Sequence, residues 1–387
     1  MLKCASVYTY EVDSPDIALS EIRKQLDQKI TLLDNTIGII MCNTEFITTG
    51  VLKHICKNLP FDIAGTTTAS QAVNEEAGEL ILTVFVMTSD DIRFRAGVTD
   101  SLISNTYDRT KAAYERAAGD ETEQPELAIV FTPFLVNYHS GDEYVKAWSS
   151  IIPGTPVFGT VTTDDTAMFS ECETIFNGTS TREAMPFILC YGNINPRFLI
   201  ATLPEDNVIS LRGKITKAKD NNVSEIDGVP ARSFFSDAGI PDMAITIPLL
   251  VSSSEAGLDD DVPVIRGLYA YSDDGTGIFA GDVEEGSIFS LLSIDADSIK
   301  SALRSEVEQI KNTRDVNGAI VFSCASRRIA LLGVNEDLAE PQIVKDTLGN
   351  DIPFIMGYSG GEICPVMVSN GKLVNRFHNY SAVALLI

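Results

Sequence analysis

Short apolar runs alternate with segments of helical spacing along most of the chain. Strand-sized apolar runs occupy residues 37–42, 80–87, 127–131, 185–191, 319–322 and 382–387. Between the runs, apolar residues recur every three or four positions, as at Ile22, Leu26 and Ile30 after the helix-start signal Ser14-Pro15. The alternation predicts buried strands joined by amphipathic helices, which is typical of an α/β fold.

Three stretches share one order of elements: a strand, a helix, a short strand that ends in glycine, a polar loop and another strand. The short strands end at Gly65, Gly159 and Gly357. The first two glycines are 159 − 65 = 94 residues apart, and the next two are 357 − 159 = 198 residues apart. This spacing indicates three copies of one unit, with about one extra unit's length before the third. Chance similarity among strand–helix–strand segments is the alternative.

The extra stretch, residues 196–295, has a different character. It is rich in strand-forming residues and carries turn signals at Asp227-Gly228, Asp274-Gly275 and Glu285-Gly286. We therefore expect an α/β fold of repeated strand–helix–strand units in mixed sheets, with a strand-rich portion interposed before the last unit. We expect two domains, residues 1–212 and residues 213–387.

Composition and charge narrow the classes of function. The 54 acidic residues against 29 basic ones give a net charge of −25, which repels phosphate backbones and anionic lipids. No apolar run reaches the length of about 18 residues needed to span a membrane, and residues 1–10 lack the pattern of a secretory signal. The seven cysteines form no C-x-x-C pair, as expected of free thiols in a reducing compartment. These features predict a cytoplasmic protein that binds neither nucleic acid nor membrane.

Metal and nucleotide sites are not indicated. The chain has three histidines and no paired cysteines, so no zinc spacing exists. Neither G-x-G-x-x-G nor G-x-x-x-x-G-K-[ST] occurs, so no phosphate-binding loop is expected. We expect no cofactor and no metal.

Polar and reactive residues cluster after the strands of the last unit. They are Cys324, Arg327, Tyr358, Gly361, Glu362, His378 and Asn379. Ligands of α/β sheets bind beyond the carboxyl ends of the strands. There, Arg327 offers a planar fork for a carboxylate, Glu362 suits an ammonium group and Gly361 allows close backbone approach. Together these residues suit an amino acid or a similar small metabolite. Alternatively, Arg327 pairs with a core carboxylate and His378 is a buried histidine without a ligand.

An enzyme is a second hypothesis for the same residues. Cys324 would be the nucleophile, His378 its base and Glu362 the group that orients the base. No local signature supports this assignment, and Arg327 would lower the pKa of the thiol without any catalysis.

Several runs of the chain resemble the FIST family of bacterial sensory domains. They are residues 318–327, 353–363 and 377–381, the segment 225–231, and, in the N-terminal part, Gly65 to Thr68, Gly159 to Asp165 and Phe176 to Gly178. The sequence departs from the family at Ser70-Gln71, where a Gly-Glu pair like Gly361-Glu362 is expected.

The resemblance implies a module that senses small molecules such as amino acids and has no enzymatic activity. It implies an output partner of the histidine kinase, diguanylate cyclase or chemoreceptor type. It also places Thr67 and Asp165 near the ligand, because the loops that carry them are polar in the family; an ordinary turn is the alternative at Asp165. We expect the ligand to bind in a cleft between the two halves and to bias their closure.

Overall fold

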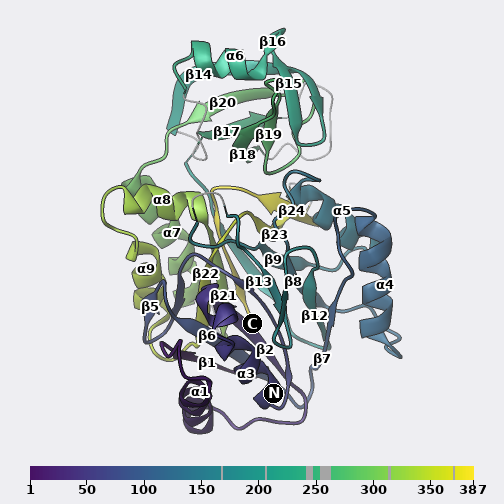
Figure 1. The fold of residues 1–387 in the computed structure, drawn as a ribbon, viewed down its shortest axis with the longest axis vertical. Coiled ribbons are helices and arrows are strands. Elements are labelled where there is room, and N and C mark those ends of the chain that lie inside the picture. Colours follow the sequence, from purple (N-terminus) through teal and green to yellow (C-terminus); the bar gives the residue numbers. More distant parts are fainter. Residues whose placement is uncertain (167–168, 205–206, 241–246, 253–262, 313–314, 369–370) are drawn as a thin grey trace.

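Three six-stranded sheets and one seven-stranded sheet make up the strands of the computed structural model, which describes residues 1–387 except 167–168, 205–206, 241–246, 253–262, 313–314 and 369–370. The six-stranded sheets form one body, and the seven-stranded sheet stands at one end of it (Figure 1). Both chain ends lie on the body.

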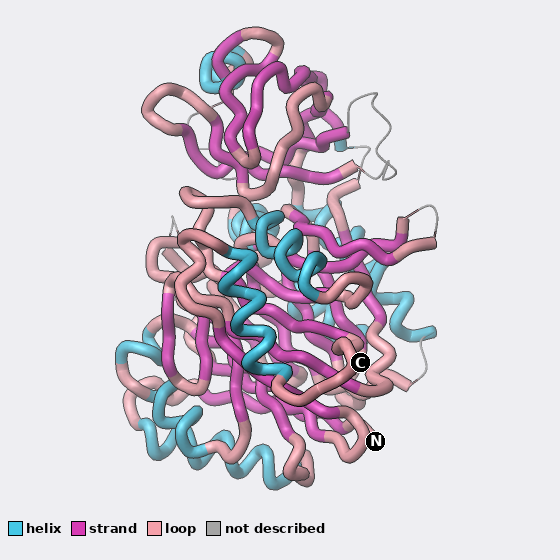
Figure 2. Tube along the Cα trace, turned by 90° about the vertical axis from the view of Figure 1, so that its right-hand side faces the viewer, coloured by secondary structure: helices cyan, strands magenta, loops and turns pink. Residues whose placement is uncertain are grey.

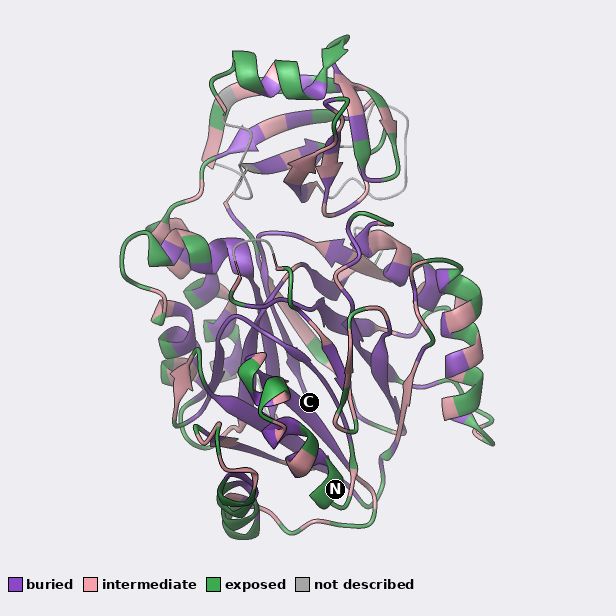
Figure 3. Cartoon of the chain, in the orientation of Figure 1, coloured by how far each residue is buried: buried purple, intermediate pink, exposed green. Residues whose placement is uncertain are grey.

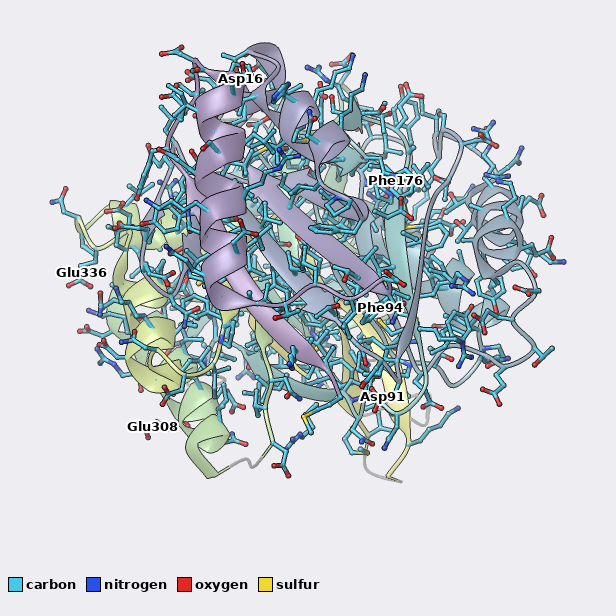
Figure 4. All side chains as sticks on the ribbon, turned by 90° about the horizontal axis from the view of Figure 1, so that it is seen from below. Asp16, Asp91, Phe94, Phe176, Glu308 and Glu336 are labelled. Atoms are coloured by element: carbon cyan, nitrogen blue, oxygen red, sulfur yellow. The ribbon has the colours of Figure 1, made fainter. Side chains whose placement is uncertain are left out.

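The first unit begins at the chain start. It comprises β1 (Lys3–Thr9), α1 (Pro15–Lys29), β2 (Thr36–Cys42), α2 (Glu45–Thr48), α3 (Val51–Asn58), β3 (Asp62–Thr67), β4 (Gln71–Val73), β5 (Ala77–Gly78) and β6 (Leu82–Thr88). Helix α1 starts at Pro15 as predicted and buries Leu19, Ile22 and Leu26. Seen from below, α1 runs across its sheet, with Asp16 at its start (Figure 4).

The second unit repeats this order. It comprises β7 (Arg93–Val98), α4 (Thr106–Ala118), β8 (Leu127–Thr132), α5 (Gly141–Ile151), β9 (Val157–Val161), β10 (Thr174–Phe176), β11 (Thr179–Thr181) and β12 (Pro186–Tyr191). Helix α4 is followed by Gly119, whose positive φ of 59° suits a glycine after a helix.

The third unit is interrupted after its first strand. It comprises β13 (Arg197–Ala201), α7 (Ala296–Glu308), the 3₁₀ turn η2 (Gln309–Asn312), β21 (Ala319–Cys324), α8 (Ala325–Leu332), α9 (Ala339–Leu348), β22 (Phe354–Ser359), β23 (Glu362–Met367), β24 (Leu373–His378) and β25 (Ala382–Leu386). Asp295 caps α7 by accepting a hydrogen bond from the Ser298 N–H.

The three sheets have one strand order and exchange hairpins in a cycle. Their orders are β1-β6-β2-β3-β10-β11, β7-β12-β8-β9-β23-β24 and β13-β25-β21-β22-β4-β5. In each sheet the third and fourth strands are parallel, and the last two form a hairpin from the next unit. Each unit therefore completes a neighbour's sheet, which confirms the internal repeat and makes the body one structure.

The core lies where the inner faces of the sheets meet. Phe85 of the first sheet, Phe131 and Phe158 of the second and Phe322 of the third lie in one buried cluster. The outer faces carry α1 and α3, α4 and α5, and α7 and α9 respectively. Figure 3 shows buried strands inside and exposed helix faces outside.

A closed barrel interrupts the third unit. It comprises β14 (Val208–Lys219), β15 (Asn222–Ile226), β16 (Val229–Pro230), α6 (Ala231–Asp237), β17 (Ile247–Ser252), β18 (Val264–Tyr271), β19 (Gly277–Phe279) and β20 (Ile288–Leu292). Its sheet runs β14-β20-β17-β18-β19-β15-β16, and β14 also pairs with β15, which closes it. The barrel has its own core around Phe235, Phe279 and Phe289.

Arg266 of β18 joins the barrel to the body. Its guanidinium donates to both carboxylate oxygens of Asp142 on α5 at 3.2 Å and to the Phe377 carbonyl of β24 at 3.0 Å. The side view in Figure 2 shows the barrel as a separate layer above the body. Both contacts to Asp142 come from Nη2, and together with the bond from Nη1 to the Phe377 carbonyl they hold the barrel against two elements of the body.

The predicted fold class is confirmed: the chain forms repeated units in mixed sheets, and the strand-rich portion precedes most of the last unit. Residue 212 lies inside β14, and β13 pairs with β25 near the C-terminus. The division into residues 1–212 and 213–387 stays a prediction. Helix α8 was not predicted.

Candidate functional site

Strand order brings the polar ends of the third unit together. Strands β21 and β22 are parallel, so Cys324 lies opposite Ser359 at their carboxyl ends. The turn at Gly360-Gly361 then leads to Glu362, which lies opposite His378 at the end of β24. This end of the body faces the barrel (Figure 1), where ligands of α/β sheets bind.

A cavity of ≈ 40 Å³, here called the inner hollow, lies between this end of the body and the barrel. The body contributes Cys324, Ser326, Ser359 and Asn379, and the barrel contributes Gly267 to Tyr269 and Ala280. Because both parts line the hollow, a molecule inside it contacts both at once.

A wider hollow of ≈ 310 Å³, here called the outer hollow, adjoins the inner one. Phe134, Phe169 and Tyr269 line both hollows. The Phe134 ring contacts the Phe169 and Tyr269 rings edge to face, with centroids 5.7 and 5.3 Å apart. The three rings therefore lie at the boundary between a small, mainly apolar inner chamber and the larger outer one.

Cys324 is the most reactive residue type in the inner hollow, but its environment keeps it a thiol. Burial and the nearby Glu362 charge raise the pKa of Cys324 to about 12. The thiol lies at the start of α8 and near the N–H groups of Ser326 and Tyr380, which favour the thiolate but do not outweigh burial.

Glu362 is fully buried and has no ion-pair partner within 4 Å among the described residues. Its Oε2 accepts hydrogen bonds from the N–H and hydroxyl of Ser381 at 3.3 and 3.1 Å. Its Oε1 makes no hydrogen bond in the described part of the chain. Ser359 lies nearby but donates its hydroxyl to the Gly361 carbonyl at 2.6 Å. Burial raises the pKa of Glu362 to about 8, so the carboxyl is largely neutral at pH 7.

Arg327 does not reach the inner hollow. Its side chain is fully buried, and its Nε and Nη2 donate to Glu340 Oε1 on α9 at 2.9 and 2.8 Å. The remaining N–H groups face the carbonyls of Ala201, Ile299 and Tyr380. The expected role as a carboxylate fork for a ligand is therefore not supported, because every donor is in use inside the protein.

Tyr358 and His378 also point to partners within the protein. The Tyr358 hydroxyl donates to the Asp337 carbonyl at 3.3 Å, and its ring packs in the core between the third sheet and its helices. His378 Nε2 donates to the Cys364 carbonyl at 2.9 Å. Burial lowers the pKa of His378 to about 4, so the ring is neutral at pH 7.

Asn379 lines the inner hollow, and Gly361 lies in the turn that leads to Glu362 without lining the hollow. The Asn379 Oδ1 accepts from the Gly267 N–H of the barrel at 3.3 Å. A Cβ on Gly361 would lie 2.2 Å from the Phe377 ring and 3.3 Å from Asn379 Nδ2. Only glycine fits this turn.

Thr67 and Asp165 lie away from the inner hollow. Thr67 is fully buried, and its hydroxyl donates to the Thr163 carbonyl at 2.7 Å, tying the first loop to the second. Thr163 in turn donates to the Tyr358 carbonyl at 2.9 Å, so the three loops interlock. Asp165 is exposed and accepts from Asn43 Nδ2 at 3.1 Å.

Sequence reasoning missed the aromatic residues of the site. Phe134 and Phe169 sit in loops of the second unit, and Tyr269 is on a barrel strand, so no spacing links them. Tyr380 also lines the inner hollow and adopts a positive φ of 58°, rare for an aromatic residue. In the sequence, Tyr380 stands between the polar residues Asn379 and Ser381, and this was the one feature that could have marked it as a site residue.

No group of three or more His, Cys, Asp or Glu side chains suited to a metal ion occurs among the described residues. None of the described helices is both long and apolar enough to cross a membrane.

Comparison with known families identifies the class of this chain. The FIST N domain matches residues 36–229 and the FIST C domain matches residues 232–365. The chain therefore belongs to the FIST family, whose domains are sensory modules of signal-transduction proteins. No curated protein sequence matches the chain. Among solved structures, cyanuric acid hydrolase from A. caulinodans is similar with 8% identity and a TM-score of 0.37, over 100% of this chain and 99% of that one.

Proposed function

We propose that this chain senses a small polar molecule that binds in the inner and outer hollows. The observation that carries the proposal is the position of the inner hollow, which lies beyond the carboxyl ends of β21 and β22 and has walls from both barrel and body. A ligand there contacts both parts, so it favours the arrangement in which both contacts are made. The signal to an output partner is a change in how the barrel sits on the body.

The structure narrows the chemistry expected from the sequence. An amino acid needs a cation for its carboxylate, and Arg327 is committed to Glu340. The proposal therefore keeps Cys324, Gly361, Glu362 and Asn379 near the ligand and leaves out Arg327, Tyr358, His378, Thr67 and Asp165. A cysteine enzyme is less favoured, because Cys324 is a buried thiol and the His378 ring is hydrogen-bonded to the backbone carbonyl of Cys364.

The proposal predicts that filling the inner hollow abolishes ligand binding. Ala325→Leu places a larger side chain at the wall, while Ala112→Leu on α4 makes the same change far from it. A thermal-shift screen of small metabolites should find a molecule that stabilises wild type by about 2.7 kcal/mol at a hundredfold excess over its Kd. Ala112→Leu should keep this gain and Ala325→Leu should lose it. Equal stabilisation of both variants would contradict the proposal.

A further inference from the structure

We propose that the two hollows together take an organic amine, with its ammonium group in the inner hollow beside Glu362 and its carbon skeleton in the outer hollow. This inference rests on the proposed function and names the class of ligand. It differs from the amino acid expected from the sequence, because it requires no carboxylate on the ligand.

The charges around the hollows favour a cation. No Lys, Arg or His side chain among the described residues lines either hollow. The neighbouring Arg266 is engaged with Asp142, the Phe377 carbonyl and the Asp282 carbonyl, and Arg327 is engaged with Glu340. Acidic groups are close: after burial, Glu362 is the main cause that raises the pKa of Cys324, and burial, Cys172 and Asp164 raise that of Tyr269. Among the described residues, an anion would therefore find no cationic side chain in the lining of either hollow.

The three rings between the hollows suit a cation as well. Phe134, Phe169 and Tyr269 present aromatic surfaces at the boundary of the two chambers. Ring faces attract ammonium groups, and clusters of such rings recognise alkylated amines. A ligand that enters the inner hollow therefore passes its positive end along these aromatic rings.

Glu362 supplies an oxygen without a partner. Its Oε2 is held by Ser381, whereas Oε1 makes no hydrogen bond among the described residues. Ser359 and Gly360, which precede Glu362 in the turn, line the inner hollow, as does the neighbouring Cys324. Glu362 itself is not among the lining residues, so an ammonium group at this wall faces its carboxyl across Ser359, Gly360 and Cys324 and pairs the carboxylate with a charge.

The sizes of the hollows fit a head group and a tail. A space of ≈ 40 Å³ holds a few atoms, since a water molecule needs roughly 10–15 Å³ by the same measure. The outer hollow of ≈ 310 Å³ has room for a carbon skeleton. The ligand therefore enters with its amine first, past rings that must turn to admit it.

Matched compounds test the charge directly. Calorimetry should compare three series with butyl, phenethyl and cyclohexylmethyl skeletons, each carried by an amine, an alcohol and a carboxylate, on the full chain. At least one amine should bind, and tighter than its alcohol and its carboxylate. Glu362→Gln should weaken that amine roughly 30-fold or more, as expected when one member of a buried charge pair is removed. Tyr269→Leu should weaken it about threefold to tenfold, and Tyr107→Leu on α4 should not.

Proton release gives a second readout that does not depend on affinity. The groups around Glu362 are Cys324 at the end of β21, Cys364 on its own strand, Arg327 on α8 and His378 on β24. Within this cluster, Glu362 is the group whose pKa, about 8, lies nearest pH 7. Pairing with an ammonium group should expel its proton, so calorimetry in two buffers of different ionisation enthalpy should show up to about one proton released per amine.

The outcomes separate this inference from the proposed function. If an alcohol or a carboxylate binds as tightly as its amine, or if Glu362→Gln leaves amine binding unchanged, the amine inference is wrong and the sensing function stands. If compounds of all three charge types fail to bind, both proposals are wrong.

Discussion

Two fully buried carboxyl groups of the third unit have opposite surroundings. Glu340 accepts two hydrogen bonds from Arg327 and one from the Ser323 hydroxyl at 2.8 Å. Glu362 has Ser381 on one oxygen and no hydrogen bond among the described residues on the other. Glu340 therefore has its partners inside the protein, whereas Glu362 has an oxygen without a hydrogen bond behind residues that line the inner hollow. A buried carboxyl with an oxygen that lacks a hydrogen bond destabilises the fold, so its presence suggests a role outside folding.

The largest effect should come from breaking the complete pair. Arg327→Met leaves Glu340 as a buried carboxylate without its cation, which should lower the free energy of unfolding by about 3–5 kcal/mol. The double variant Arg327→Met/Glu340→Leu should recover much of this loss, because no isolated charge remains. Urea denaturation of the three proteins measures both effects. A loss below about 1 kcal/mol for Arg327→Met would contradict the conclusion that the Arg327–Glu340 pair stabilises the fold.

The buried carboxyl of Glu362 should make the free energy of unfolding depend on pH. The pKa of Glu362 is raised to about 8 in the fold, against about 4.3 in the unfolded chain, so the native state holds the extra proton between these values. The free energy of unfolding should therefore fall as pH rises from 5 to 8, by up to about 1.4 kcal/mol per pH unit from this group.

Glu362→Gln should remove that contribution, so the variant should gain stability relative to wild type as pH increases. Denaturation midpoints at several pH values measure the difference. A parallel course for the two proteins between pH 5 and 8 would show that Glu362 is ionised in the fold and has a partner.

The smallest effect concerns the thiol beside Glu362. Because Cys324 is a buried thiol, Cys324→Ser should change ligand stabilisation by less than about 1 kcal/mol. Labelling with iodoacetamide at pH 8 should be far slower for Cys324 in the folded protein than after unfolding. Fast labelling of Cys324 in the folded protein would support the cysteine-enzyme hypothesis. So would a substrate that the wild type turns over and the Cys324→Ser variant does not.

The sequence predicted the repeat because each unit buries its strands in the same way. Continuous apolar runs and closing glycines are local signals, and they located β2, β8 and β21 with little error. The exchange of hairpins between sheets could not be predicted from the sequence, since β4 and β10 have only three residues each and β4, β10 and β23 all pair with strands of another unit.

The candidate site was predicted in part, because some of its residues follow strands that the sequence itself marks. Parallel pairing of β21 with β22 places Cys324 and Glu362 near each other, and position in the chain indicated this. The sequence could not predict that Glu340 is the partner of Arg327, because Glu340 lies on α9 and nothing in its sequence context marks it as buried. The alternative reading of the sequence, that Arg327 pairs with a core carboxylate, describes Arg327 correctly.

Register also corrects the comparison between loops. Gln71 pairs with Gly357, whereas Glu362 pairs with Thr160, one residue beyond Gly159. Thr174 pairs with Thr66 in the same way. The counterparts of Glu362 in the first two units are therefore Ser70 and Thr174, and the third unit alone places a carboxyl at this position.

The ionisation of Glu362 on adding an amine tests the central claim most directly. With the glutamate carboxyl carbons labelled with ¹³C, the Glu362 signal should report a neutral acid at pH 7 and move to the carboxylate position as the tightest-binding amine of the panel is titrated. A signal that stays at the neutral-acid position at saturation, or that is a carboxylate before any amine is added, would contradict the account.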